Sequence, residues 1–143
     1  WIINFINFFK VEFRTNKFKV RYYETDQMGF VHHSNYLKYF EKARIDWLDS
    51  IGLSYSDIEK SGIILPVVNA NIRFIHPAFF GDTLEVKLTI NSSPTVKIDF
   101  NYTLFNQDKK IITTGETRIA FLDSASRKPI KCPREISEKI SDI

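Results

Sequence analysis

Cysteine is almost absent from this chain of 143 residues, and a charge excess of either sign is small. The single cysteine, Cys132, has no partner for an intrachain disulfide, which fits a reducing cytoplasm. The 20 basic and 17 acidic residues give a net charge of +3, too small a surplus to indicate a nucleic-acid-binding surface. We therefore expect a cytoplasmic protein without a nucleic-acid partner.

Long hydrophobic runs are also missing. The apolar stretch at residues 1–9 is far shorter than the roughly 20 residues that span a bilayer, and it lacks the basic region and cleavage site of a signal peptide. Residues 1–16 are interpreted as an N-terminal extension of open role, either an extra strand or an upstream segment, with a membrane-touching anchor as the alternative. We expect no stable membrane insertion.

Metal-ligand spacing is not found among the three histidines, because His32 and His33 are adjacent and His76 is remote. The sequence therefore predicts no metal site and no cofactor. A G-x-S-x-G motif is absent too, so a serine hydrolase has no support. Aromatic residues, in contrast, are frequent: 13 Phe, 6 Tyr and 2 Trp predict large apolar contacts in a core, an interface or a pocket.

The periodicity of the chain predicts one long helix followed by a series of strands. Residues 17–23 alternate as a strand, and a helix with apolar residues at helical spacing begins at Ser34 or Asn35 and stops at Gly52. Ser56 and Glu59 have capping-box spacing, which predicts a further short helix. Four strands are then expected, and the tail is expected to be helical; these segments are residues 65–76, 83–91, 95–106, 110–123 and 133–143.

A helix with a wide apolar face must pack against a sheet. The pattern therefore predicts an α+β protein, with a curved antiparallel sheet wrapped around one long helix, which is the hotdog fold. We place the hotdog domain at residues 17–133 and a C-terminal tail at residues 134–143.

The most informative segment is residues 23–44, YETDQMGFVHHSNYLKYFEKAR. It places Asp26 in a short polar turn just before the predicted helix. A helix N-terminus offers free backbone N–H groups and a partial positive charge, and a carboxylate beside it can act as a base or a nucleophile. This arrangement predicts a hydrolytic site.

The segment Tyr22–Arg44 resembles the signature of the 4-hydroxybenzoyl-CoA thioesterase-like acyl-CoA thioesterases. The turn His76–Asp82, HPAFFGD, resembles a turn of the same family, and the likeness extends from about residue 17 to residue 133. The matching positions in the first segment are Tyr22, Thr25-Asp26, Gly29, Val31, Asn35-Tyr36, Phe40-Glu41 and Ala43-Arg44.

The resemblance implies that Asp26 attacks the thioester carbonyl or activates water, and that the backbone N–H of His33 polarises that carbonyl. The side chains of His33 and Tyr22 resemble assisting groups in one branch of the family. Substrate contacts are expected from Gly29, Val31 and His32 around the turn. His32 and His76 have the plainer interpretation of structural or turn residues, and Glu41 that of a surface or interface ion-pair residue.

The substrate and the assembly are expectations of the same kind. The family implies a homodimer or homotetramer, and an acyl-CoA, aroyl-CoA or acyl carrier protein thioester as substrate. Basic residues after strand turns could hold the CoA phosphates. These residues are Lys97, Arg127, Lys128 and Lys131. The alternatives are a non-catalytic acyl-CoA-binding hotdog module, which would lack the catalytic carboxylate, and a dehydratase, whose Gly- and Pro-rich context is absent.

Overall fold

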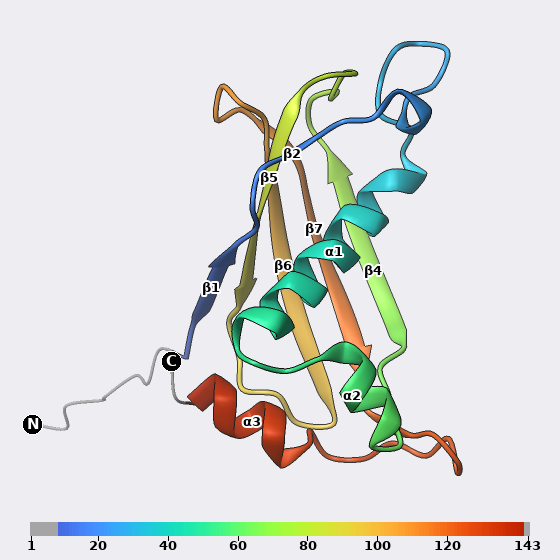
Figure 1. Ribbon diagram of the computed structural model, residues 1–143, viewed down its shortest axis with the longest axis vertical. Helices are drawn as coiled ribbons and strands as arrows, with labels where there is room; N and C mark the ends of the chain where they lie inside the picture. Colours follow the sequence, from blue (N-terminus) through green and yellow to red (C-terminus); the bar gives the residue numbers. More distant parts are fainter. Residues whose placement is uncertain (1–8, 142–143) are drawn as a thin grey trace, which may run out of the picture.

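A single antiparallel sheet with one long helix across its face dominates the computed structural model, which describes residues 9–141 (Figure 1). The strands are β1 (Val11–Arg14), β2 (Phe18–Lys19), β3 (Ile63–Ile64), β4 (Val67–Phe74), β5 (Thr83–Ile90), β6 (Lys97–Phe105), β7 (Ile111–Ala120) and β8 (Leu122–Asp123). The helices are a 3-10 turn η1 (Tyr22–Glu24), α1 (Ser34–Ser50), α2 (Tyr55–Lys60) and α3 (Arg134–Ser141). The main sheet has the order β1-β5-β6-β7-β4, and β2 also pairs with β5, whereas β3 and β8 form a separate small ribbon.

The core lies between α1 and this sheet. Leu84, Val86, Leu88 and Ile90 alternate along β5 and are fully buried. The ring of Phe40 from α1 stacks on Tyr102 of β6 with 4.2 Å between centroids. A Cβ on Gly115 of β7 would lie 2.6 Å from Phe40, so only glycine leaves room for this ring. The predicted sheet around one helix is therefore confirmed.

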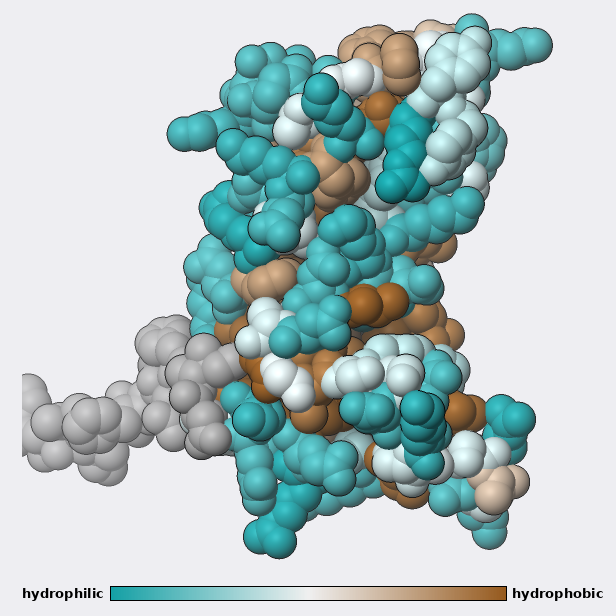
Figure 2. All heavy atoms as spheres, viewed as in Figure 1, coloured by the Kyte–Doolittle hydropathy of each residue, from teal (hydrophilic) through white to brown (hydrophobic). Residues whose placement is uncertain are grey.

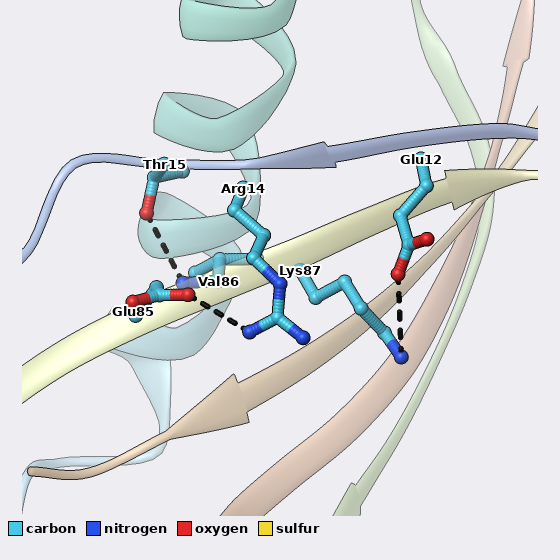
Figure 3. A network of polar contacts seen from close by, with 6 residues as sticks. All are labelled: Glu12, Arg14, Thr15, Glu85, Val86 and Lys87. Atoms are coloured by element: carbon cyan, nitrogen blue, oxygen red, sulfur yellow. Dashed lines mark hydrogen bonds and ion pairs between the residues drawn. The ribbon is translucent and has the colours of Figure 1, made fainter. Parts of the chain in front are cut away.

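Strand β1 closes one edge of the sheet (Figure 3). Thr15, which follows it, is 5% exposed and exchanges two hydrogen bonds with Val86, of 3.0 and 3.1 Å. Arg14 and Glu85 are 2.9 Å apart, and their exposure limits this ion pair to about 1 kcal/mol or less. The N-terminal extension, whose role the sequence did not fix, thus contributes an edge strand at residues 11–14. The interpretation of residues 1–8 lies outside the described part of the chain.

Three local predictions were wrong. The strand expected at residues 17–23 ends after Lys19, and the chain then forms η1, in which Tyr22 is 76% exposed. Helix α1 is preceded by His33, which makes no side-chain cap, and α2 is capped by Ser54 rather than Ser56. The stop of the long helix at Gly52, which has φ +79°, and the C-terminal helix are confirmed.

Strand β4 is the other edge of the sheet and is exposed along nearly its whole length. Val67, Val68 and Phe74 are 47%, 51% and 55% exposed. Figure 2 shows brown, hydrophobic surface along the margin where Figure 1 places β4. Among residues 9–141, no helix is long and apolar enough to cross a membrane.

Candidate active site

Asp26 lies in a tight turn between η1 and α1 that its own carboxylate holds together. One oxygen, Oδ1, accepts hydrogen bonds from the N–H groups of Met28 at 2.9 Å and Phe30 at 3.2 Å. The Asp26 N–H donates to the Phe30 carbonyl at 2.8 Å, and Gly29 completes the turn with φ +80°, a conformation that favours glycine. The other carboxylate oxygen, Oδ2, makes no hydrogen bond to a described residue. Asp26 therefore orders its turn and still keeps one oxygen for chemistry.

The turn is attached to the rest of the molecule on both sides. The N–H of Val31 donates to the carbonyl of Ala78 at 2.8 Å, which ties the turn to the connection between β4 and β5. The carbonyl of Glu24 accepts from the N–H of His32 and from the side-chain amide of Asn35, each at 2.8 Å. Asn35, which the sequence suggested as a cap, is instead a buried anchor between the turn and the helix.

The backbone at the start of α1 leaves one donor free. The N–H groups of Val31 and His32 bond to carbonyls, that of Ser34 to the ring of His32, and that of Asn35 to the His32 carbonyl. The N–H of His33 has no partner in the described part of the chain. A free N–H at a helix N-terminus, where the helix dipole is positive, is suited to stabilise a developing oxyanion.

Asp26 and His33 line one open pocket of about 300 Å³ between the start of α1 and the end of β4. Val31 also lines it, as do residues that the sequence analysis did not assign to the site, among them Tyr36, Phe74 and His76. Tyr36 is 4% exposed, and burial raises the pKa of its hydroxyl, with the Asp26 carboxylate acting in the same direction. The only sequence signal for Tyr36 and His76 was their place in the two matched motifs, and Phe74 lies outside both motifs.

Other predicted residues lie elsewhere. The ring of Tyr22 packs edge-on against Phe80, 5.6 Å between centroids, and Tyr22 does not line the Asp26 pocket. The ring of His32 lies against that of His33, with its Nδ1 2.8 Å from the Ser34 hydroxyl. Gly29 is exposed in the turn. The roles of these three residues stay predictions.

The predicted basic residues lie at the other end of the molecule from the Asp26 pocket. Lys97 begins β6 opposite Ala120, and Arg127, Lys128 and Lys131 occupy the exposed connection from β8 to α3. In Figure 1 this connection lies at the bottom, whereas the turn between η1 and α1 lies at the top. Within one chain, therefore, these side chains do not approach Asp26.

A second, more enclosed cavity of about 320 Å³ lies near that basic end, between the last turns of α1 and the sheet. Its walls are mainly apolar and include Trp47, Phe100 and Phe121, with Glu41 and Arg44 from α1. Leu65 and Val67, at the start of β4, also line it. This cavity was not foreseen, because its walls come from distant parts of the sequence.

Comparisons with known proteins identify the family to which the chain belongs. A model of the thioesterase-like superfamily matches residues 20–140. The crystal structure of a DHNA-CoA thioesterase from Staphylococcus aureus matches with a TM-score of 0.86 and 33% identity, over 92% of this chain and 89% of that one. The chain belongs to the thioesterase-like superfamily, has the hotdog fold and is a thioester hydrolase.

Two relatives of this chain are named for different thioester substrates. The acyl-acyl carrier protein thioesterase ATL3 of Arabidopsis thaliana is 30% identical over 129 residues, which are 90% of this chain and 67% of ATL3. A 1,4-dihydroxy-2-naphthoyl-CoA hydrolase of Thermosynechococcus vestitus is 29% identical over 115 residues, which are 80% of this chain and 79% of that protein.

Proposed function

We propose that the protein hydrolyses an acyl-CoA thioester to the free acid and CoA at the Asp26 pocket. The observation that carries this is the meeting of two unsatisfied groups in one pocket, the Oδ2 atom of Asp26 and the N–H of His33. Thioester hydrolysis needs both: a base or nucleophile, and a donor for the oxyanion. Family membership and the names of the relatives support the substrate class.

In this proposal the substrate carbonyl oxygen accepts a hydrogen bond from the His33 N–H. Asp26 either takes a proton from the attacking water or attacks the carbonyl carbon itself, giving an anhydride that water then opens. The negative charge that develops on the carbonyl oxygen is stabilised by the helix start. Collapse of the intermediate breaks the C–S bond and releases the CoA thiol, with the proton coming from water or from Asp26.

The acyl group needs an apolar site, which we propose comes from a second copy of the chain. The exposed edge strand β4 can pair with itself about a twofold axis, and such a pair is antiparallel. The partner's Val67 end then lies beside the Phe74 end of this chain. Because the apolar cavity lies at the former end and the Asp26 pocket at the latter, the pair joins the two.

The same pairing accounts for the basic residues. It brings the partner's connection between β8 and α3 toward the Asp26 pocket, so that Lys97, Arg127, Lys128 and Lys131 of one copy hold the CoA phosphates at the site of the other. The protein is thus proposed to be at least a homodimer. The non-catalytic alternative, a module that only binds acyl-CoA, is separated from this proposal by the experiment that follows.

Asp26→Asn keeps the shape and the two N–H hydrogen bonds but removes the base and nucleophile. We expect turnover to fall by at least about a hundredfold in a free-thiol release assay over a panel of acyl-CoA and aroyl-CoA thioesters. Asp49→Asn, on the exposed last turn of α1, is the matched control and should keep full activity. Near-normal hydrolysis by a folded Asp26→Asn variant would refute the assignment, and a parent protein that binds but does not hydrolyse any thioester would favour the binding module.

A further inference from the structure

A cleft of about 520 Å³ lies on the other side of α1, next to β2 and η1. None of the residues that line it lines the Asp26 pocket. On α1 its lining includes Lys38 and Lys42, one turn apart, whereas His33 and Tyr36 line the Asp26 pocket. This cleft is therefore a separate feature of the molecule, and the proposed hydrolysis makes no use of it.

Four cationic side chains surround this cleft, against one carboxylate. Lys19 and Lys38 form no ion pair with a described residue. Lys42 bonds to Asp46 at 2.6 Å, and Arg21 donates to the hydroxyl of Tyr23 at 2.6 Å. Because three of the four cations form no ion pair with a described residue, the cleft should attract a ligand with several negative charges, such as a diphosphate.

The inner wall of the cleft is formed by two buried polar residues, Glu24 and Tyr39. Glu24 is only 9% exposed, and its carboxylate accepts a hydrogen bond from the Arg21 N–H at 2.8 Å. Tyr39 is 5% exposed, and its hydroxyl has no hydrogen-bond partner among residues 9–141. Burial raises the pKa of this hydroxyl, with the Glu24 carboxylate next in effect, so it stays protonated at neutral pH. A ligand group that donates a hydrogen bond, such as an exocyclic amine, is suited to this carboxylate.

Aromatic rings complete the lining. The ring of Phe18 lies 5.2 Å from that of Tyr39, and the Lys42 ammonium lies 5.2 Å from the Phe18 centroid. Tyr23 is 74% exposed at the side of the cleft, with the Arg21 guanidinium 5.8 Å from its ring. The exposed ring of Tyr23 offers a stacking surface to a flat heterocycle.

We propose that this cleft binds an adenine nucleotide. Its phosphates contact the cations at the rim, its base packs against the exposed ring of Tyr23, and its exocyclic amine donates to Glu24. The occupant is a free nucleotide that acts as an effector, because the proposed function already places the nucleotide end of CoA at the connection between β8 and α3. Equilibrium binding of a free nucleotide requires no hydrolysis, so this binding does not depend on the proposed thioesterase function.

The test is calorimetric titration of the full chain with ADP and with IDP, which lacks the exocyclic amine. We expect ADP to bind at least about tenfold more tightly than IDP, because IDP leaves the buried carboxylate without its donor. The double variant Lys38→Ala, Lys42→Ala should weaken ADP binding at least about tenfold. The matched control Lys60→Ala, Lys139→Ala removes the same charge from α2 and α3 and should stay within about twofold of the parent.

Circular dichroism verifies that each variant is folded. A free effector is expected to inhibit or activate hydrolysis without competing with the thioester substrate, and this effect should be lost in the cleft variant. Competition that is lost in the cleft variant would place the nucleotide end of CoA in this cleft and overturn the effector assignment. No ADP binding at millimolar concentration, or equal affinity for ADP and IDP, overturns the proposal. So does a loss of binding in Arg127→Ala, Lys128→Ala, Lys131→Ala with none in the cleft variant.

Discussion

The side-chain amide of Asn35 donates a hydrogen bond of 2.8 Å to the backbone carbonyl of Glu24, eleven residues earlier in the chain. Asn35 is 7% exposed, so this bond is protected from water. The same carbonyl accepts the His32 N–H. One buried carbonyl thus fixes the helix start relative to the turn of Asp26, and the two groups proposed for the chemistry belong to a single rigid unit.

The N–H of His33 can be removed without removing the helix. His33 has φ −55°, close to the value that proline imposes, and the start of a helix tolerates proline because its N–H is free there. For His33→Pro we expect a fall in turnover of about a hundredfold or more, since it deletes the proposed oxyanion donor. The measurement is steady-state hydrolysis, with circular dichroism to verify the fold.

His33→Ala is the matched control for this backbone prediction, because it keeps the N–H and deletes only the imidazole. If the side chain takes no part in the chemistry, His33→Ala should retain turnover within a few-fold of the parent. The opposite ranking, with the alanine variant inactive and the proline variant active, would assign the role to the side chain.

The β4 edge is predicted to be the interface of the dimer. Val68→Lys places a charge on the exposed strand, where edge pairing would bury it, and we expect the variant to become monomeric at micromolar concentration by light scattering. Its activity should fall as well, because the acyl cavity would no longer meet the Asp26 pocket. Val96→Lys, at a 43% exposed position away from β4, should change neither property. A parent protein that is monomeric and fully active would contradict both expectations.

The basic connection between β8 and α3 is predicted to bind the nucleotide end of CoA. Arg127→Ala, Lys128→Ala, Lys131→Ala should raise KM for acyl-CoA more than it lowers kcat. The effect should shrink with salt, because exposed charges are screened within about 8–10 Å at physiological ionic strength. A pantetheine thioester, which lacks the nucleotide, is the control substrate. Equal effects on both substrates, or none on either, would remove this segment from the substrate site.

Gly115 is predicted to be required for the packing of α1 on the sheet. A Cβ at this position would lie 2.6 Å from Phe40 and 3.0 Å from the Asn71 carbonyl oxygen. Because Phe40 is fully buried and stacked on Tyr102, it has little room to move. For Gly115→Ala we expect a loss of about 1–3 kcal/mol in the free energy of unfolding, measured with urea. Thr114→Ala, next to it on β7, should cost clearly less; equal costs would show that the clash is relieved.

The order of elements could be predicted from the sequence, because hydrophobic periodicity records which face of each element is buried. The alternation at Leu84, Val86 and Leu88 gave β5, and the helical spacing with Gly52 as the stop gave α1. The sequence also determined where a catalytic carboxylate could lie, since Asp26 and the helix start are close along the chain. Local chemistry of this kind needs no long-range contact.

Strand ends, hydrogen-bond partners and cavities depend on contacts between residues that are distant in the sequence, so they were known only from the tertiary structure. The strand expected at residues 17–23 ended early, because its pairing with β5 stops at Lys19. The chain then forms η1, where Tyr22 is exposed. Asn35 became an anchor rather than a cap, because the Glu24 carbonyl lies within its reach. The free N–H of His33, the cavity beside Trp47 and the cleft beside Tyr39 all depend on which partners surround a group in space. Spacing along the chain does not encode such neighbours, since the sheet and α1 bring them together only when the chain folds.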